Sequence, residues 1–155
     1  MRISVAAYFL LASIAGALLT VGSVAAQSPV PGHALRFDGV YRSGPDADSA
    51  GGEYCAYLRF YPKGGVVGVS SECTEDTPKR MRNWLTWTNA RKPGAGLQTG
   101  SYKFQEGTIA FVTRSEYGKV SYRGVVAGDS LKLDSRSYIN GHVDSDTYVF
   151  VDWSR

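Results

Sequence analysis

The sequence is poor in the residues that most often carry catalysis, since its 155 residues include only two cysteines and two histidines. His33 lies in a stretch rich in proline and glycine, and His142 lies beside the turn dipeptide at Asn140. Neither histidine belongs to a nucleophile motif such as G-x-S-x-G. A zinc site built on the two cysteines would need histidines close to them in the sequence. We therefore expect no enzyme and no cofactor.

The carboxylates near the C-terminus are the remaining candidates for a metal site. Asp144 and Asp146, with Asn140 nearby, carry oxygen ligands at a spacing that hard cations could use. The segment lacks the acid at its end that calcium-binding loops use. Turn and capping chemistry explains Asx residues in such a segment without any ligand. We expect no metal here.

The sequence also lacks an excess of charge of one sign. Seventeen Lys and Arg residues stand against 14 Asp and Glu residues, which gives a net charge of +3. Without Arg2, which lies in the N-terminal segment described next, 16 basic residues remain against 14 acidic ones. This balance gives no electrostatic basis for nucleic acid as the main partner.

One long apolar run is present, at the N-terminus. Arg2 precedes it, and Val24 and Ala26 supply small side chains before a cleavage site, so the pattern predicts a secretory signal peptide over residues 1–26. A transmembrane anchor is the alternative, because about 20 apolar residues can span a bilayer. The apolar run ends in small residues, and no basic residues follow it directly to stop its transfer across the membrane. Both features favour cleavage. We expect an exported protein, periplasmic or extracellular, that starts at Gln27 and has no stable membrane anchor.

The rest of the chain predicts one β domain. Residues 27–36 are rich in proline and predict a flexible lead-in. Residues 37–155 are dense in Tyr, Val, Ser, Thr and Gly, with a turn signal about every ten residues, as in antiparallel all-β domains. We expect eight strands, over 37–43, 53–61, 66–73, 97–105, 108–115, 119–127, 130–139 and 147–153. Alternation in the last five places these core pairs on one face: Tyr102 and Phe104, Ile109 and Phe111, Val120 and Tyr122, Leu131 and Leu133, Tyr148 and Phe150.

The segment between the third and fourth strands has the period of a helix. Asp76 or Thr77 can act as the N-cap, Pro78 lies in the first turn, and Lys-Pro-Gly at 92–94 ends the segment. The spacing i, i+3, i+4 then gives the helix one apolar face, which we expect to be buried: Met81, Trp84 and Leu85.

Short strands in sequential order, joined by tight turns, predict an up-and-down meander. Eight such strands close into a barrel and so remove the free edges. The predicted fold is therefore an all-β, eight-stranded antiparallel meander barrel with one short helix between strands 3 and 4. We expect the helix to cap one mouth. A barrel of this size is either filled with side chains or holds one small ligand.

The two cysteines lie at the outer ends of the predicted hairpin YCAYLRFYPKGGVVGVSSEC. In an oxidising compartment a structural disulfide between Cys55 and Cys73 is expected. A turn centred on Gly64 would place the two cysteines directly opposite each other, at a Cα separation of about 4.5 Å. A three-residue loop would instead pair Cys55 with Ser71, and the disulfide would need a bulge or a diagonal reach. We favour the first register.

The first predicted strand, FDGVY, resembles the entry strand of the calycins, the group of lipocalin-like, fatty-acid-binding and avidin-like barrels. The match is a Gly-x-aromatic, carried by Gly39 and Tyr41. The resemblance implies a calycin-like barrel. Residues 57–71 and 124–142 are also similar to small bacterial proteins of unassigned function, which supports the fold and adds nothing on activity.

Two functions suit such a barrel, and both are binding functions. In the first, a small apolar or amphipathic ligand lies inside, against aromatic side chains whose tyrosine hydroxyls offer polar contacts. The candidate cavity residues are Tyr102, Phe104, Phe111, Tyr122, Tyr148 and Phe150. A continuous internal cavity of about 300 Å³ or more would favour this function.

In the second function the barrel is filled, and its loops and basic helix contact an envelope component, either as an interaction module or as an inhibitor. The candidate contacts with an anionic surface are Lys79, Arg80 and Arg82. We favour, for the helix itself, the plainer interpretation of a lid with a solvated basic face and a buried Trp84.

Overall fold

The computed structural model describes residues 34–47 and 51–154. The predicted signal peptide, most of the lead-in and His33 lie outside the described residues. The described part of the chain contains nine strands, in the order β1 (Gly39–Arg42), β2 (Asp46–Ala47), β3 (Glu53–Tyr61), β4 (Gly65–Glu72), β5 (Gln98–Gln105), β6 (Thr108–Ser115), β7 (Gly118–Ala127), β8 (Ser130–Ser137) and β9 (Val143–Asp152). Helices α1 (Thr77–Trp84) and α2 (Trp87–Ala90) separate β4 from β5.

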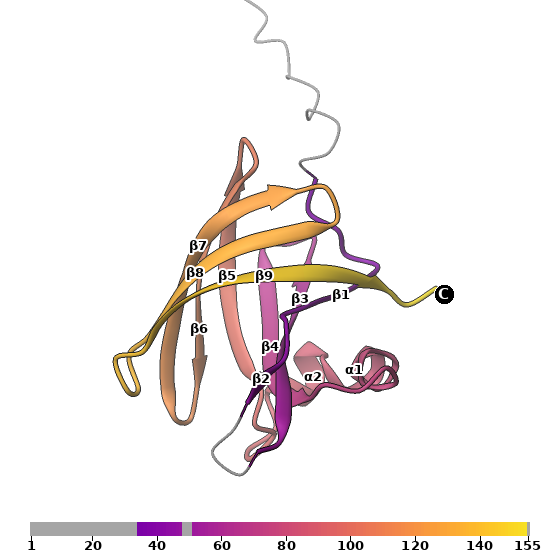
Figure 1. The fold of residues 1–155 in the computed structure, drawn as a ribbon, viewed down its shortest axis with the longest axis vertical. Helices are drawn as coiled ribbons and strands as arrows, with labels where there is room; N and C mark the ends of the chain where they lie inside the picture. The colour runs from indigo at the N-terminus through magenta and orange to yellow at the C-terminus, as the bar shows by residue number, and fades with distance from the viewer. Residues whose placement is uncertain (1–33, 48–50, 155) are drawn as a thin grey trace, which may run out of the picture.

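The strands form a closed antiparallel meander (Figure 1). Each strand from β3 to β9 pairs with the next, and β1 closes the ring because it pairs with both β9 and β3. Strand β2 has only two residues, and they pair with the first two residues of β3, Glu53 and Tyr54. The predicted all-β, eight-stranded meander barrel, with its short helix between the third and fourth barrel strands, is confirmed.

The inside of the barrel holds the larger of two hydrophobic clusters. Cross-strand partners share a face, so Tyr41 opposite Leu58 and Phe111 opposite Tyr122 point the same way. The cluster consists of Leu35, Tyr41, Leu58, Phe60, Val66, Ile109, Phe111, Val126, Leu131, Leu133, Tyr148 and Phe150, with Ala56, Tyr102, Phe104 and Tyr122 packed against it. The period-two pattern therefore identified most interior side chains of the second half of the chain. It wrongly included Val120, which is half-buried and outside the cluster, and it missed Val126, which is fully buried in it.

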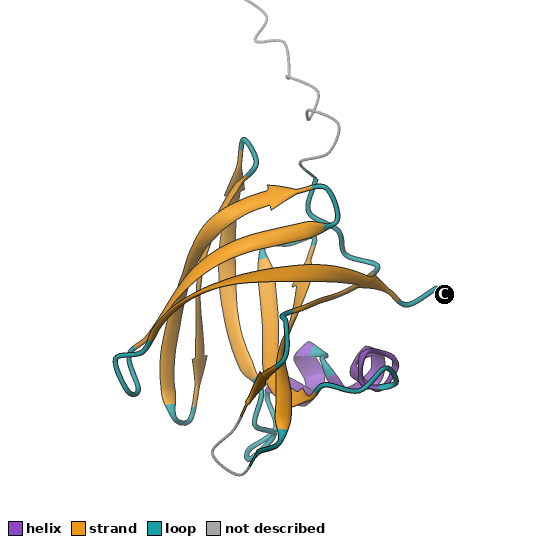
Figure 2. Cartoon of the chain, viewed as in Figure 1, coloured by secondary structure: helices purple, strands orange, loops and turns teal. Residues whose placement is uncertain are grey.

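The helices lie on the outside of the wall and not over a mouth, so the expectation of a capping helix was wrong (Figure 2). Val40, Tyr57 and Val67 alternate with inward-facing neighbours and point outward. A convex wall with such apolar residues needs a cover, and Met81 and Leu85 provide it. The second cluster consists of Val40, Cys55, Tyr57, Val67, Val69, Met81, Leu85 and Leu97.

Trp84 is not in this core: it is 37% exposed, whereas Met81 and Leu85 are buried. The buried stripe of α1 begins at Thr77 and Pro78 and continues through Met81 to Leu85, which places Trp84 on the rim. The expectation that Trp84 is buried was therefore wrong. The helix also ends at Trp84, because Leu85 leaves the helical conformation with ψ of 66°.

Polar bonds from the barrel hold the two ends of α1. The hydroxyl of Tyr61 donates to the Leu85 carbonyl at 2.6 Å, and Nη1 of Arg59 donates to the same oxygen at 3.0 Å. Nε1 of Trp153 donates to the Pro78 carbonyl at 2.7 Å. Carbonyls at the end of a helix lack partners within the helix, so Arg59 and Tyr61 satisfy a group that would otherwise need water.

The β3–β4 hairpin has a three-residue loop, so the favoured cysteine register was wrong. Tyr61 pairs with Gly65, and Cys55 therefore pairs with Ser71. Gly64 adopts a φ of +82°, and its N–H donates to the Tyr61 carbonyl, which is the usual chemistry of a three-residue loop ending in a left-handed glycine.

The disulfide between Cys55 and Cys73 forms all the same, by a diagonal reach, with Cα atoms 5.2 Å apart. Cys73 lies one residue beyond the end of β4, and its N–H still donates to the Glu53 carbonyl of β3 at 3.4 Å, which keeps it beside the strand that carries Cys55. The disulfide joins the two strands at the open end of the hairpin. Cys55 belongs to the second cluster, and Cys73 packs against it.

Candidate functional site

The six aromatic side chains predicted to line a cavity all lie in or against the interior cluster. They contact one another and their neighbours. Phe111 stacks on Tyr122 with ring centroids 4.5 Å apart, and Phe60 meets Phe111 and Tyr102 edge-on at 5.4 and 5.3 Å. Tyr41 meets Phe150 at 5.0 Å. Aromatic rings therefore pack against each other across the inside of the barrel.

One end of the interior is polar and acidic. The Thr113 hydroxyl donates to Oε1 of Gln98 at 2.7 Å. Burial raises the pKa of the Tyr148 phenol, which also lies near Tyr122 and Asp146. Burial likewise raises the pKa of Asp146, and the charge of Asp144 and a hydrogen bond with it add to the shift.

Asp144 and Asp146 thus lie on β9, not in a loop, because β9 begins four residues earlier than predicted. Within the described part of the chain, no group of three or more His, Cys, Asp and Glu side chains is arranged to hold a metal ion. His142 is exposed in the β8–β9 turn, where its N–H donates to Oδ1 of Asn140.

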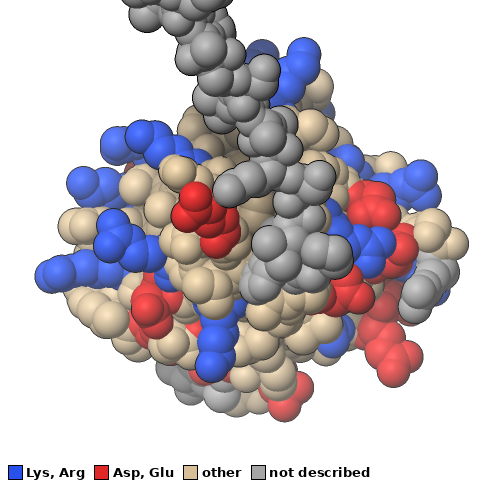
Figure 3. Space-filling model, turned by 90° about the horizontal axis from the view of Figure 1, so that it is seen from above, with Lys and Arg blue, Asp and Glu red and all other residues tan. Residues whose placement is uncertain are grey.

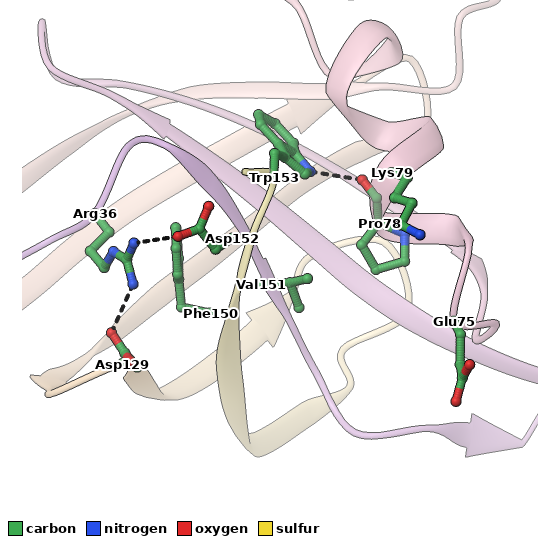
Figure 4. Close-up of a pocket in the computed structure, with 9 residues that line it drawn as sticks. All are labelled: Arg36, Glu75, Pro78, Lys79, Asp129, Phe150, Val151, Asp152 and Trp153. Carbon is green, nitrogen blue, oxygen red and sulfur yellow. Dashed lines mark hydrogen bonds and ion pairs between the residues drawn. The ribbon is translucent and has the colours of Figure 1, made fainter. Parts of the chain in front are cut away.

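Arg36 lies across the opposite end of the interior (Figure 4). Its guanidinium group lies 4.0 Å from the centre of the Phe150 ring, and its backbone N–H donates to the Tyr41 hydroxyl. The guanidinium group pairs with Asp129 at 3.2 Å and Asp152 at 3.0 Å. It also pairs with Asp38, and this contact is the main cause of the low pKa of that carboxyl.

A hollow of about 290 Å³ lies beside Arg36, between β9 and α1 (Figure 4). Two of the side chains that line it are already bound within the hollow. Arg36 pairs with the carboxylate of Asp152, and Trp153 donates to the Pro78 carbonyl. Hydrogen bonds from Ser154 lower the pKa of Asp152 to about 2. We interpret this hollow as a junction that fastens the entering chain, β9 and α1; Glu75 and Lys79 line its outer part.

The basic side chains of α1 are exposed but accompanied by acids. Arg80 pairs with Glu72 and donates to the Thr77 hydroxyl at 3.0 Å. Lys79 lies 3.9 Å from Asp76. Arg82 lies in the last turn, where a positive charge complements the helix dipole. The three residues proposed for an anionic surface therefore do not form an isolated positive patch.

A stronger concentration of charge lies on the outer wall of the barrel. Because Tyr102, Phe111 and Tyr122 are cross-strand partners that point inward, the residues between them on β5–β8 point outward. Those outward positions carry six basic residues and one acid, Asp134. The six, here called the basic face, are Lys103, Arg114, Lys119, Arg123, Lys132 and Arg136.

Figure 3 shows Lys and Arg gathered on the side of the molecule where Figure 1 places β6, β7 and β8, while Asp and Glu mix with basic residues on the side of α1. A near-neutral chain thus carries an uneven charge distribution. Alternation could have shown this, since each basic residue of the face lies one position from an inward-facing residue. Sequence reasoning missed it because it considered only contiguous basic residues.

A shallow groove of about 570 Å³ runs over the basic face. Lys103, Arg123 and Arg136 line it together with Asp134. The remaining outward-facing residues of the groove are small or apolar: Ser101, Ala110, Val112, Ser121 and Val143. The groove crosses several strands, each about 4.8 Å from the next. It is therefore long enough to hold an extended chain.

Comparison with protein-family models, with curated proteins and with solved structures found no match. The pairing of the strands alone shows the fold, a closed eight-stranded antiparallel barrel. No helix among residues 34–47 and 51–154 is long and apolar enough to cross a membrane.

Proposed function

We propose that this protein is an exported, non-catalytic binding module of the cell envelope, with a filled barrel whose basic face holds an acidic polysaccharide. The proposal keeps the interaction-module hypothesis and moves its contact surface from α1 to the outer wall of β5–β8. The observation that carries it is the six-to-one excess of basic over acidic residues at the outward positions of these strands.

The charge pattern favours a polyanion over a single charged group. Like charges on neighbouring strands repel one another, so the face gains most from a ligand that presents several negative charges in a row. Within residues 34–47 and 51–154, no ion pair joins the six basic side chains to an acid, whereas Arg80 pairs with Glu72. Lys103, Arg114, Arg123 and Lys132 are therefore available to a ligand, while Lys119 and Arg136 also lie near the Tyr138 ring.

The rest of the groove favours a sugar polymer over nucleic acid. Ser101 and Ser121 offer hydroxyls that can bond to sugar hydroxyls. Single-stranded nucleic acid is commonly held by aromatic side chains on which bases stack, and the outward positions of β5–β8 carry no aromatic residue.

The interior supports the same choice. Rings that already stack at 4.5 Å, such as those of Phe111 and Tyr122, would have to separate to admit an apolar ligand. Membership of the calycin group remains part of the proposal: Gly39 and Tyr41 occupy the first barrel strand, and Tyr41 is fully buried.

Binding of polygalacturonate, with neutral dextran as the control polymer, tests this function. We expect the protein to bind polygalacturonate at low salt, to lose it as salt rises, and to ignore dextran. Replacing Lys103 and Arg123 by Gln should weaken binding about tenfold, as expected for two surface ion pairs of roughly 0.5–1 kcal/mol each.

The matched control replaces Lys79 and Arg82 by Gln on α1, which removes the same charge elsewhere. This variant should bind polygalacturonate like the parent. Equal losses in both variants would show attraction to net charge alone, and a loss confined to the α1 variant would restore the helix as the contact; either result would overturn the assignment to the basic face. Preference for single-stranded DNA over polygalacturonate would overturn the choice of ligand.

A further inference from the structure

Two neighbouring turns expose large apolar side chains at one end of the barrel. Tyr117 in the β6–β7 turn is 71% exposed, and Tyr138 and Ile139 in the β8–β9 turn are 53% and 51% exposed. We call these three residues the apolar tip. In Figure 1 both turns lie on the side of the barrel opposite to the end where the chain enters β1. Contiguous exposed apolar surface often marks a site of interaction with a partner or a membrane.

The two turns form one preformed surface. The N–H of Tyr138 donates to the Lys119 carbonyl at 2.9 Å, which joins the two hairpins beyond the end of the paired strands. Ile139 lies directly over Gly118, where an added Cβ would be 2.8 Å from Cγ1 of Ile139. Ser115 and Ser137 accept hydrogen bonds within the turns, so the backbone is held locally.

Basic side chains surround the tip. Nζ of Lys119 lies 4.3 Å from the centre of the Tyr138 ring, and the guanidinium group of Arg136 lies 5.8 Å from it. Arg114 follows on β6, and a hollow beside the β6–β7 turn adds Lys92. We call Lys92, Arg114, Lys119 and Arg136 the basic collar. Glu116 lies within the turn as an acid.

We propose that the apolar tip and basic collar dock on a bilayer that contains anionic phospholipids. Tyrosine suits the boundary between headgroups and acyl chains, because its ring is apolar and its hydroxyl is polar. The collar lies where it can reach lipid phosphates while Tyr117 and Ile139 enter the headgroup layer. A surface that combines protruding apolar side chains with basic ones is complementary to such a bilayer in both polarity and charge.

The tip differs from the groove in what it can recognise. The outward-facing residues of the groove include no aromatic side chain, which suits an extended polar chain, whereas the tip protrudes and is mainly apolar. The lipid proposal rests on Tyr117, Tyr138 and Ile139, none of which lines the groove. Arg114, Lys119 and Arg136 belong to both the basic face and the collar, so the apolar tip is what distinguishes lipid binding from polysaccharide binding.

Co-sedimentation with vesicles tests the proposal, with protein purified from an exporting host. We expect binding to vesicles made of equal parts phosphatidylglycerol and phosphatidylcholine and little binding to phosphatidylcholine alone. Replacing Tyr117 and Ile139 together by Ser should lower the partition coefficient about tenfold, because two apolar side chains no longer leave water. The matched control is Val149→Ser, which removes an equally exposed apolar side chain from the outside of β9; its binding should not change.

Insertion is tested separately with Tyr117→Trp. Vesicles with brominated acyl chains should quench the fluorescence of this variant more than that of the parent. Failure to bind the anionic vesicles would overturn the proposal. So would binding that the tip variant leaves unchanged, since that shows adsorption by charge alone. If the tip variant instead abolishes self-association of the protein without vesicles, the tip is an interface between copies and the lipid assignment is wrong.

Discussion

At the scale of single residues, the acidic end of the barrel carries the clearest electrostatic cost. Burial raises the pKa of Asp146 above the ordinary aspartate value of 3.8, and the neighbouring charge of Asp144 adds to the effect. A carboxyl with a raised pKa in the folded state stabilises the fold while it is protonated. That contribution is complete below pH 3.8 and is lost as the pH rises through the folded-state value.

Asp146→Asn should therefore raise the melting temperature at pH 7, because the variant carries no charge at this position. The difference from the parent should shrink as the pH falls toward 3.8. Asp144→Asn should give part of the same effect, since it removes the nearby charge. Thermal unfolding monitored by circular dichroism across this pH range measures the difference. A constant difference at all pH values would show that packing, and not ionisation, is responsible.

Gly65 is a second residue whose role depends on a single contact. It faces Trp87, and a Cβ added to it would lie 2.2 Å from Cζ2 of the indole ring. Gly65→Ala should therefore displace Trp87 and cost about 1–3 kcal/mol of unfolding free energy. Gly44→Ala is the matched control, because a Cβ there would meet nothing within 4 Å, and it should change stability by less than about 0.5 kcal/mol. Urea titration of both variants gives the comparison.

At the scale of elements, α1 is held by a narrow stripe of side chains and by bonds from the barrel to its ends. Met81 is 2% exposed and lies against the outer wall, whereas Trp84 lies at the rim. The stability of the helix should therefore depend on the smaller residue.

We expect Met81→Ala to cost about 2–5 kcal/mol, as other buried large-to-small substitutions do. Trp84→Ala should cost less than about 1 kcal/mol. Chemical denaturation followed by far-ultraviolet circular dichroism measures both changes. A larger loss at Trp84 than at Met81 would mean that the helix packs on its other side in solution.

The elements also show which features the sequence could predict. Period-two alternation located the strands and the inward-facing residues of β5–β9 because one face of each strand is apolar. The three-residue loop at Gly64 could not be distinguished by pattern, since both registers place apolar residues on the same faces. Trp84 was misplaced because i, i+3, i+4 spacing allows a stripe on either side of Met81, and only the wall that it meets decides between them.

At the scale of the whole molecule, the sequence predicted the barrel but not the uneven charge on its outer wall, where we propose that a ligand binds. The net charge concealed the basic face, because acids gather near Arg36, α1 and the polar end of the interior. Inward and outward positions had to be assigned before the basic residues of four strands could be added together. The groove and the tip depend on the curvature of the barrel and on contacts between turns that are distant in the sequence.

Export is a prediction for the whole chain. When the protein is produced in an exporting host, the N-terminal residue of the product should be Gln27, within a residue or two. Edman sequencing or intact mass measurement decides this. Recovery of the full-length chain from the inner membrane would show that the N-terminal segment is an anchor and not a signal peptide.

The way the barrel closes has a consequence for how quickly the protein folds. The hairpins from β3 to β9 join strands that are neighbours in the sequence, but Tyr41 of β1 pairs with Phe150 of β9, more than a hundred residues away. Contacts of such high sequence separation form slowly. Before β9 pairs with them, β1 and β8 each have one edge whose backbone groups are unpaired and can pair with another chain. We expect chains that end before β9 to aggregate, even though they retain the Cys55–Cys73 disulfide.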